Sequence, residues 1–232
     1  MKSALIIGGS SSLGGMVVKT FLNSDHSITA TYAKSSSKIE NSKYMTSVHL
    51  DLTSEKSINK FALDMSLQNK TFDKCIFLAG YLPGSKIEDY RHSEIDDVMA
   101  INFSGFVKAY KLILPRFNDN AQVIIVSSVS GQRGSYDPVY AASKAALIAF
   151  MKSLSQVSPL KVRANAVAPG LISNTSMFDD MEPSRQAFHI KNSPTGKLTS
   201  REDLSKIILD ISMPHWSNMN GAIVQINGGS YV

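Results

Sequence analysis

A chain of 232 residues, of which 43% are hydrophobic, is long enough to bury a substantial core within a single α/β domain. Its 24 lysines and arginines exceed its 19 acidic residues, but these cations are dispersed and form no run. This pattern favours an ordinary solvated surface over a nucleic-acid partner. The apolar stretches are also much shorter than the ~20 residues that cross a membrane as a helix, so no membrane association is expected.

The single cysteine and the five histidines bear on whether the chain forms disulfides or binds a metal. Cys75 can form no internal disulfide, and its apolar neighbours predict a small buried side chain, which fits a reducing cytoplasm. The histidines stand apart from one another, so no metal site is expected. The residues after Lys2 read as a buried strand rather than a signal peptide, and a cytoplasmic location is the prediction.

Short apolar runs alternate with longer segments of helical period, a pattern typical of βαβ units. Strands are expected at residues 4–7, 28–32, 46–50, 74–78, 122–127, 162–167 and 223–226. Helices are expected at residues 13–22, 57–67, 94–117, 138–156 and 201–211. Right-handed crossovers then place helices on both faces of one doubly wound, seven-stranded parallel sheet. Such a sheet binds ligands at the carboxyl ends of its strands.

A glycine-rich turn, Gly8-Gly9-Ser10-Ser11-Ser12-Leu13-Gly14, joins the first strand to the first helix. In this context backbone amides and the positive helix end can approach a diphosphate group. The candidate contacts are Gly8, Ser10, Ser11 and Leu13. The alternative is a flexible polar turn without a ligand.

The end of the second strand bears on the choice of dinucleotide. An acid about 20 residues after the turn would hold a ribose 2'-hydroxyl, but no carboxylate occurs between Asp25 and Glu40. Tyr32, Lys34 and Ser35 stand there instead, and a cation with hydroxyls suits a 2'-phosphate. NADP(H) is therefore favoured over NAD(H). A solvated lysine loop is the alternative.

Two further strand ends offer cofactor contacts. Asp51 and Leu52 close the third strand, where Asp51 could face an adenine edge. The alternative for Asp51 is a role in capping the next helix, for which Thr53 and Ser54 are also candidates. Ala79 and Gly80 end the fourth strand, and such small residues allow a ribose, or simply a tight turn, to come close.

Tyr140 and Lys144 stand four positions apart in an alanine-rich segment, so both side chains lie on one helical face. A cation beside a phenol lowers its pKa from about 10, which permits proton transfer near neutrality. A half-buried ring beside a solvated amine is the common alternative. Ser128, at the end of the fifth strand, could hold a substrate carbonyl close to Tyr140 or could merely form a turn.

Together these motifs strongly resemble the short-chain dehydrogenase/reductase family, from the first strand to the C-terminus. The family's glycine-rich turn, catalytic serine and YxxxK motif match residues 7–14, Ser128 and Tyr140 to Lys144, and its helix asparagine matches Asn102. Residues 165–172 and 220–229 resemble its nicotinamide-side loop and last strand. By this resemblance the cofactor set extends to Pro169, Gly170, Ile172 and Thr175, and the fold is Rossmann-type.

Three departures from the family pattern concern cofactor support. Ile7 replaces a threonine, and Ser12 replaces the middle glycine of the turn. Phe77 and Leu78 replace two asparagines that form a polar link bracing the sheet in relatives. The residues that carry the family's chemistry, Asn102, Ser128, Tyr140 and Lys144, are all present.

The resemblance implies hydride transfer between a nicotinamide and a carbonyl or hydroxyl of a small molecule, with Tyr140 as acid or base. Ser128 would bind the reacting oxygen, Lys144 would bind the ribose and lower the pKa of Tyr140, and Asn102 would position a relay water. Residues 173–195 would form a substrate lid within the single domain of residues 1–232. Ketone reduction is the expected activity, with reduction of an acyl-carrier-bound 3-oxo group or non-catalytic dinucleotide sensing as alternatives. A homodimer or homotetramer is expected.

Overall fold

The computed structural model describes residues 1–34, 42–157 and 162–231. In these residues seven strands form one parallel sheet in the order β3-β2-β1-β4-β5-β6-β9. Their bounds are Lys2–Ile7 (β1), His26–Tyr32 (β2), Met45–His49 (β3), Phe72–Phe77 (β4), Phe117–Val126 (β5), Arg163–Pro169 (β6) and Ile223–Ile226 (β9). The strand order reverses between β1 and β4, as in doubly wound sheets, so the predicted single-domain fold is confirmed.

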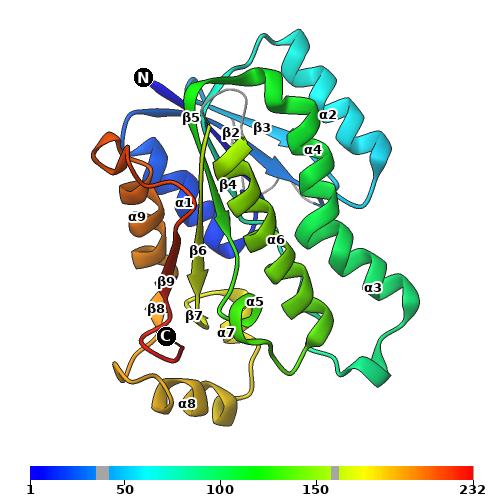
Figure 1. Ribbon diagram of the computed structural model, residues 1–232, viewed down its shortest axis with the longest axis vertical. Helices are drawn as coiled ribbons and strands as arrows, with labels where there is room; N and C mark the ends of the chain where they lie inside the picture. Colours follow the sequence, from blue (N-terminus) through cyan, green and yellow to red (C-terminus); the bar gives the residue numbers. More distant parts are fainter. Residues whose placement is uncertain (35–41, 158–161, 232) are drawn as a thin grey trace.

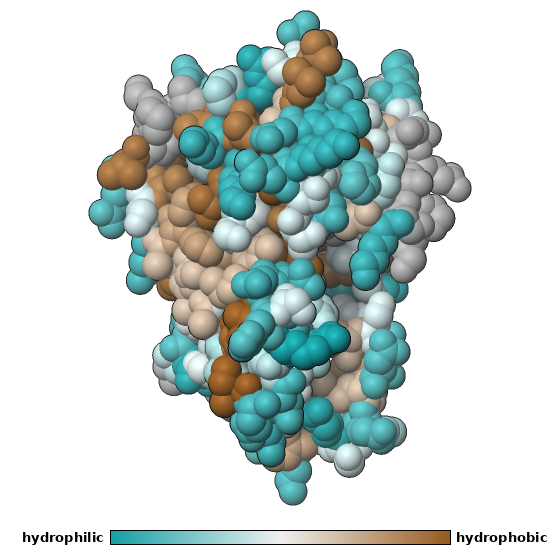
Figure 2. All heavy atoms as spheres, turned by 90° about the vertical axis from the view of Figure 1, so that its right-hand side faces the viewer, coloured by the Kyte–Doolittle hydropathy of each residue, from teal (hydrophilic) through white to brown (hydrophobic). Residues whose placement is uncertain are grey.

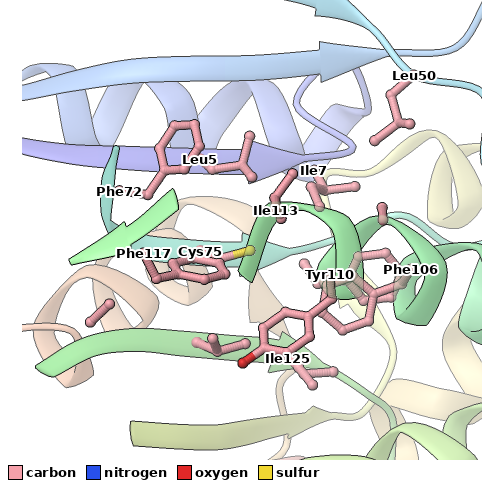
Figure 3. Packing of buried hydrophobic residues seen from close by; sticks show 14 of the residues in the cluster. Leu5, Ile7, Leu50, Phe72, Cys75, Phe106, Tyr110, Ile113, Phe117 and Ile125 are labelled. Atoms are coloured by element: carbon pink, nitrogen blue, oxygen red, sulfur yellow. The ribbon is translucent and has the colours of Figure 1, made fainter. Parts of the chain in front are cut away.

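The side chains of the strands belong alternately to two separate buried hydrophobic clusters. In β1, Leu5 and Ile7 belong to one buried cluster, whereas Ala4 and Ile6 belong to the other. Because successive side chains of a strand point to opposite faces, a strand that is apolar throughout must be covered on both sides. Figure 3 shows the first cluster, in which side chains of the sheet such as Leu5 and Ile125 lie among those of the covering helix segment.

Helices cover the two faces unequally (Figure 1). Helices α1 (Ser12–Leu22) and α9 (Arg201–Ile211) lie side by side on one face. The other face carries α2 (Glu55–Leu67), α4 (Gly105–Ile113) and α6 (Pro138–Val157). The sequence predicted α1, α2, α6 and α9 to within two residues at each end.

The predicted helix of residues 94–117 is wrong in its continuity and in its end. It is divided into α3 (His92–Met99), a π-helical stretch (Ala100–Ser104), α4 and a 3₁₀ turn (Leu114–Arg116). Pro115 lies in that last turn, where a proline cannot donate to a continuing α-helix. Phe117 therefore starts β5, which is longer than predicted and shifts register against β4 between Phe72 and Lys74.

Phe77 replaces the lost polar link of the family pattern with apolar packing. Its ring is fully buried and stacks on Phe106 of α4, with ring centroids 4.1 Å apart and planes 17° apart. The end of β4 is therefore held against the helix layer by two aromatic rings, a contact that two asparagines could not make.

The segment between β6 and α9 lies beyond the carboxyl ends of β5 and β6 (Figure 1). It contains a short parallel pair, β7 (Ile172–Ser173) and β8 (Thr199–Ser200), with α7 (Ser176–Asp179) and α8 (Pro183–Lys191) between them. The pairing of β7 with β8 closes this segment at its base. Two further short elements, α5 (Ser130–Arg133) and the 3₁₀ turn Ile87–Asp89, lie at the same end of the sheet.

Candidate active site

The start of α6 positions Tyr140. Pro138 is its first residue, where the missing N–H costs no hydrogen bond, and the preceding Asp137 accepts a 2.9 Å hydrogen bond from Tyr140 N through Oδ1. Ser127, just after β5, donates through Oγ to Lys144 O at 2.8 Å. Helix α6 is thus fastened to the carboxyl end of β5, and Tyr140 and Lys144 share one face of it as predicted.

Lys144 is a buried cation inside this site, with 4% of its surface exposed. Its Nζ donates to Val126 O at 3.1 Å and lies 5.7 Å from the centre of the Tyr140 ring. Burial lowers the pKa of Lys144 to about 8, so the amine is still mainly charged at neutral pH. A solvated amine, the common alternative for a Tyr-Lys pair, does not describe this residue.

Burial also has the largest effect on the pKa of the Tyr140 phenol. It raises the pKa of Tyr140 to about 12, a hydrogen bond with the Ser128 side chain acts in the opposite direction, and the charge of Asp137 raises the pKa further. The family resemblance assigned the lowering of this pKa to Lys144. In the protein alone the Ser128 side chain is the group that lowers it, and the Lys144 amine donates to Val126 O.

Asn102 joins the same cluster from the π-helical stretch, a departure from α-helix that is frequent at functional sites. Its side chain is fully buried. Oδ1 accepts from Tyr81 N at 2.7 Å, and Nδ2 donates to Tyr81 O at 3.0 Å and to Ser143 Oγ at 2.9 Å. A side chain at Gly80 would begin 3.4 Å from Lys144 Nζ and 3.9 Å from Asn102 Oδ1, so the glycine leaves this space open. The structure therefore brings the predicted tetrad together.

Asp137 is a site residue that the sequence analysis missed. It is 3% exposed, and its carboxylate accepts from Gly84 N (3.0 Å), Ser85 N (3.3 Å) and Tyr90 OH (2.7 Å) besides Tyr140 N. Burial raises the pKa of Tyr90, and the hydrogen bond from Tyr90 OH to Asp137 is the second largest cause of this shift. The loop after β4 is thereby fixed to the start of α6. An aspartate before a helix proline signals a cap, but no sequence pattern reveals its partners 47 to 53 positions away.

The glycine-rich turn has the tight geometry predicted for it. Gly8 has φ +90°, and a Cβ there would lie 2.7 Å from Ala79 N. A Cβ at Gly14 would meet the Gly8 carbonyl oxygen. Ser11 caps α1 by accepting from Gly14 N at 2.9 Å. The first turn of α1 contains no acidic residue, and a hollow of about 390 Å³ borders the turn, so the donor set and the space fit a dinucleotide diphosphate.

At the adenosine end, the residues predicted for the cofactor lie at neighbouring strand ends. Tyr32 ends β2 and packs edge-on against His49 of β3, with ring centroids 5.6 Å apart, and Lys34 is exposed two residues later. Asp51 Oδ1 accepts from Thr53 N at 2.9 Å, and Ser54 caps α2. Ser35 lies outside the described residues.

The residues predicted after β6 have mixed roles. Pro169 ends β6, Gly170 N donates to Ile226 O at 3.0 Å, and Ile172 belongs to β7. Thr175 uses its hydroxyl to cap α7, accepting from Phe178 N at 3.3 Å and donating to Ile172 O at 2.9 Å. The preceding residue, Asn174, takes a left-handed conformation (φ 60°) that asparagine tolerates.

Two negative findings concern the described part of the chain. No three side chains of His, Cys, Asp or Glu are grouped there as metal ligands. Its helices are also too short or too polar to cross a membrane.

The comparisons with known proteins agree with this geometry. A family model described as Enoyl-(Acyl carrier protein) reductase matches residues 8–231. The 3-oxoacyl-(acyl-carrier-protein) reductase FabG of Vibrio harveyi is 24% identical over 239 residues, covering 100% of this chain and 98% of that protein. An uncharacterized short-chain type dehydrogenase/reductase of Sinorhizobium fredii is 28% identical over 160 residues, covering 66% and 63% of the two chains.

A solved structure of a short-chain dehydrogenase/reductase from Brucella melitensis superimposes with a TM-score of 0.92 at 20% identity, covering 100% of this chain and 97% of that one. The chain belongs to the short-chain dehydrogenase/reductase family. It is an oxidoreductase of the class that acts on CH–OH and C=O groups with a nicotinamide cofactor.

Proposed function

We propose that this protein is an NADP(H)-dependent ketone reductase. The observation that carries the proposal is the convergence of Tyr140, Ser128, Lys144 and Asn102 beside the open space at Gly80. When bound, the nicotinamide supplies the hydride for reduction and accepts it in the reverse direction. The chain itself then needs to bind the carbonyl oxygen and deliver a proton to it.

Tyr140 is the proton donor in this proposal. With its pKa near 12, the phenol is fully protonated at neutral pH, which is the state that carbonyl reduction requires. Ser128, whose side chain lowers the pKa of that phenol, donates to the same substrate oxygen. Lys144 binds the nicotinamide ribose, and Asn102, which is fixed to the backbone of Tyr81, positions a water between Lys144 and solvent.

The preference for NADP(H) rests on Lys34. This lysine is exposed just after β2, and the sequence between Asp25 and Glu40 contains no carboxylate that would bind a free 2'-hydroxyl. Tyr32, Asp51 and Leu52 contact the adenosine, while Gly8, Ser10, Ser11 and Leu13 bind the diphosphate. The NAD(H) alternative predicts that Lys34 has no effect on affinity.

Residues 173–195 form the substrate lid in this proposal. Met177, Phe188 and Ile190 expose apolar side chains in this segment, so a partly apolar ketone fits it best. Closure over the substrate would exclude water from Tyr140.

A second candidate is reduction of a 3-oxoacyl group on an acyl carrier. The similarity to FabG proteins over the whole chain favours it, and the exposed Arg133 at the same end of the sheet could meet an acidic carrier. In either case we expect a homodimer or homotetramer that pairs through α4 and α6. Helix α6 exposes Ala142, Ala145 and Ala149 along one stripe, and Figure 2 shows hydrophobic patches among hydrophilic residues on the face to the right of Figure 1.

The test is an assay of NADPH absorbance with a panel of ketones, 3-oxoacyl thioesters and, in reverse, alcohols. Turnover of ketones with NADPH supports the proposal. Turnover restricted to carrier-bound 3-oxoacyl groups favours the second candidate. Tight NADPH binding without turnover of any substrate class would indicate a dinucleotide sensor and contradict both.

A further inference from the structure

The side chain of Arg201 lines the hollow beside the glycine-rich turn, and this cation is not part of the family motifs described above. Three serines of the turn, Ser10, Ser11 and Ser12, line the hollow together with Asp179 of α7 and Arg201 of α9. Arg201 is the first residue of α9 and follows the helix cap Ser200. It is 189 positions from Ser12 in the sequence but adjacent to it in the fold.

Two hydrogen bonds fix the guanidinium of Arg201 in this place. Nη1 donates to Ser12 Oγ at 2.8 Å, and Nε donates to Glu202 Oε1, also at 2.8 Å. Glu202 is held in turn by Asn174 Nδ2 at 3.0 Å, and these bonds lower the pKa of Glu202 to about 2. A guanidinium has five N–H donors, and the two bonds above use Nε and Nη1. Among the described residues Nη2 has no hydrogen-bond partner.

The serines of the turn are not equivalent as donors. Ser11 Oγ is occupied, because it donates to Gly8 O and accepts from Gly14 N, both at 2.9 Å. Ser12 Oγ accepts from Arg201, and its own proton has only a 3.5 Å contact with Asn174 O. The Ser12 hydroxyl and the free Arg201 nitrogen can therefore both donate to an anion in the hollow.

Charges of both signs surround the hollow, because Arg201 forms an ion pair with Glu202 through Nε at 2.8 Å. Asp179 is the one carboxylate among the described lining residues and opposes a negative ligand. The amino end of α1 and Arg201 act in the other direction, and no acidic side chain stands in the first turn of α1. The residue that replaces the family's middle glycine is thus the one whose side chain holds the additional cation.

We propose that Arg201 and Ser12 form an additional binding site for the diphosphate group of the dinucleotide, in which the guanidinium donates a charge-assisted hydrogen bond to a phosphate oxygen. This inference rests on the proposed function insofar as the ligand is a dinucleotide. It does not depend on the substrate or on the choice between NADP(H) and NAD(H), because both contain the diphosphate.

The experiment is a titration of the full-length protein with NADPH and with NADH, followed by fluorescence, at two salt concentrations. Arg201→Ala should weaken both nucleotides by about 10- to 150-fold, the loss of one charge-assisted contact, and should reduce the salt dependence of binding. The matched control is Lys206→Ala on the same helix. Lys206 is 73% exposed and pairs only loosely with Asp203 at 3.7 Å, so this variant should bind within twofold of wild type.

Each other outcome has a defined meaning. Unchanged binding of both nucleotides by Arg201→Ala would overturn the inference while leaving the proposed function intact. A loss confined to NADPH would place the guanidinium at the 2'-phosphate and overturn it as well. If wild type binds neither nucleotide, the proposed function itself fails.

A folding defect is separated from a binding defect by thermal unfolding without nucleotide. If Arg201→Ala unfolds more easily than wild type, Arg201→Gln provides the decision. Glutamine can still donate to Ser12 but carries no charge, so it must show the same loss for both nucleotides. Wild-type affinity in Arg201→Gln would refute the proposed contact.

Discussion

Replacing Phe77 by asparagine, the residue of the family pattern, should strongly destabilise this protein. The ring is fully buried at the end of β4 and stacks on Phe106 at 4.1 Å. Truncating a buried phenylalanine costs about 3–5 kcal/mol, and this cost includes its contacts with neighbouring rings such as Phe106. A buried amide without partners adds about 1–3 kcal/mol more. A loss of at least about 4 kcal/mol is a large part of the 5–15 kcal/mol that stabilises a typical domain.

Urea unfolding followed by circular dichroism measures this difference. Phe77→Leu, which keeps an apolar side chain, should cost much less than Phe77→Asn. Leu63→Asn makes a similar change on α2 at a residue that is 57% exposed, and it should shift the free energy of unfolding by about 0.5 kcal/mol or less. If Phe77→Asn unfolds within 1 kcal/mol of wild type, the aromatic stack does not replace the polar link.

Three further changes test other parts of the structure. Lys74 is buried in β4, donates to Ser212 Oγ at 2.8 Å, and has its pKa lowered by burial from 10.5 to about 8. Between pH 8 and 10.5 the Lys74 side chain therefore binds more protons in the unfolded chain than in the native protein, so its contribution to stability should rise with pH there. Lys74→Met should stabilise the protein by about 1–3 kcal/mol at pH 7. Relative to wild type it should also lower the slope of stability against pH between pH 8 and 10.5 by up to about 1.4 kcal/mol per pH unit. Urea titrations at pH 7, 9 and 10 check both effects, and a less stable variant at pH 7 would contradict them. Lys34→Ala should weaken NADPH by about 10- to 150-fold and leave NADH unchanged, as measured by parallel titrations; an unchanged ratio would move the 2'-phosphate away from Lys34. Ser12→Gly should still bind the dinucleotide, but more weakly than wild type because it lacks the hydroxyl that holds Arg201. Ser12→Leu should weaken binding further without unfolding the chain, and equal binding by both variants would place the turn away from the diphosphate.

Much of the fold could be predicted because strands buried on both faces are apolar throughout. Residues 4–7 and 123–126 have this property, and both lie in central strands of the sheet. The division of residues 94–117 could not be predicted in the same way. A single π-helical turn at Asn102 shifts the helical period by only one residue, and Phe117 is as compatible with the end of a helix as with the start of a strand.

In the candidate site, likewise, the sequence predicts contacts between residues that are close in the chain but not contacts between distant ones. Tyr140 and Lys144 are neighbours on one helix, so their spacing in the sequence already places them together. Asp137 and Arg201 act on residues that are distant in the chain, such as Tyr90 and Ser12, and only the folded structure shows these contacts. The environment of Tyr140 was also beyond the sequence, because burial outweighs any nearby cation in setting its pKa.

The central claim, that Tyr140 transfers the proton, is tested most directly by Tyr140→Phe. This variant removes only the hydroxyl and leaves the ring to pack, so NADPH affinity and unfolding should stay near wild type. With a ketone substrate identified by the panel, kcat should fall by about 100- to 10,000-fold across pH 6 to 10. A Phe variant that keeps near-wild-type kcat with unchanged NADPH affinity would contradict the proposed mechanism.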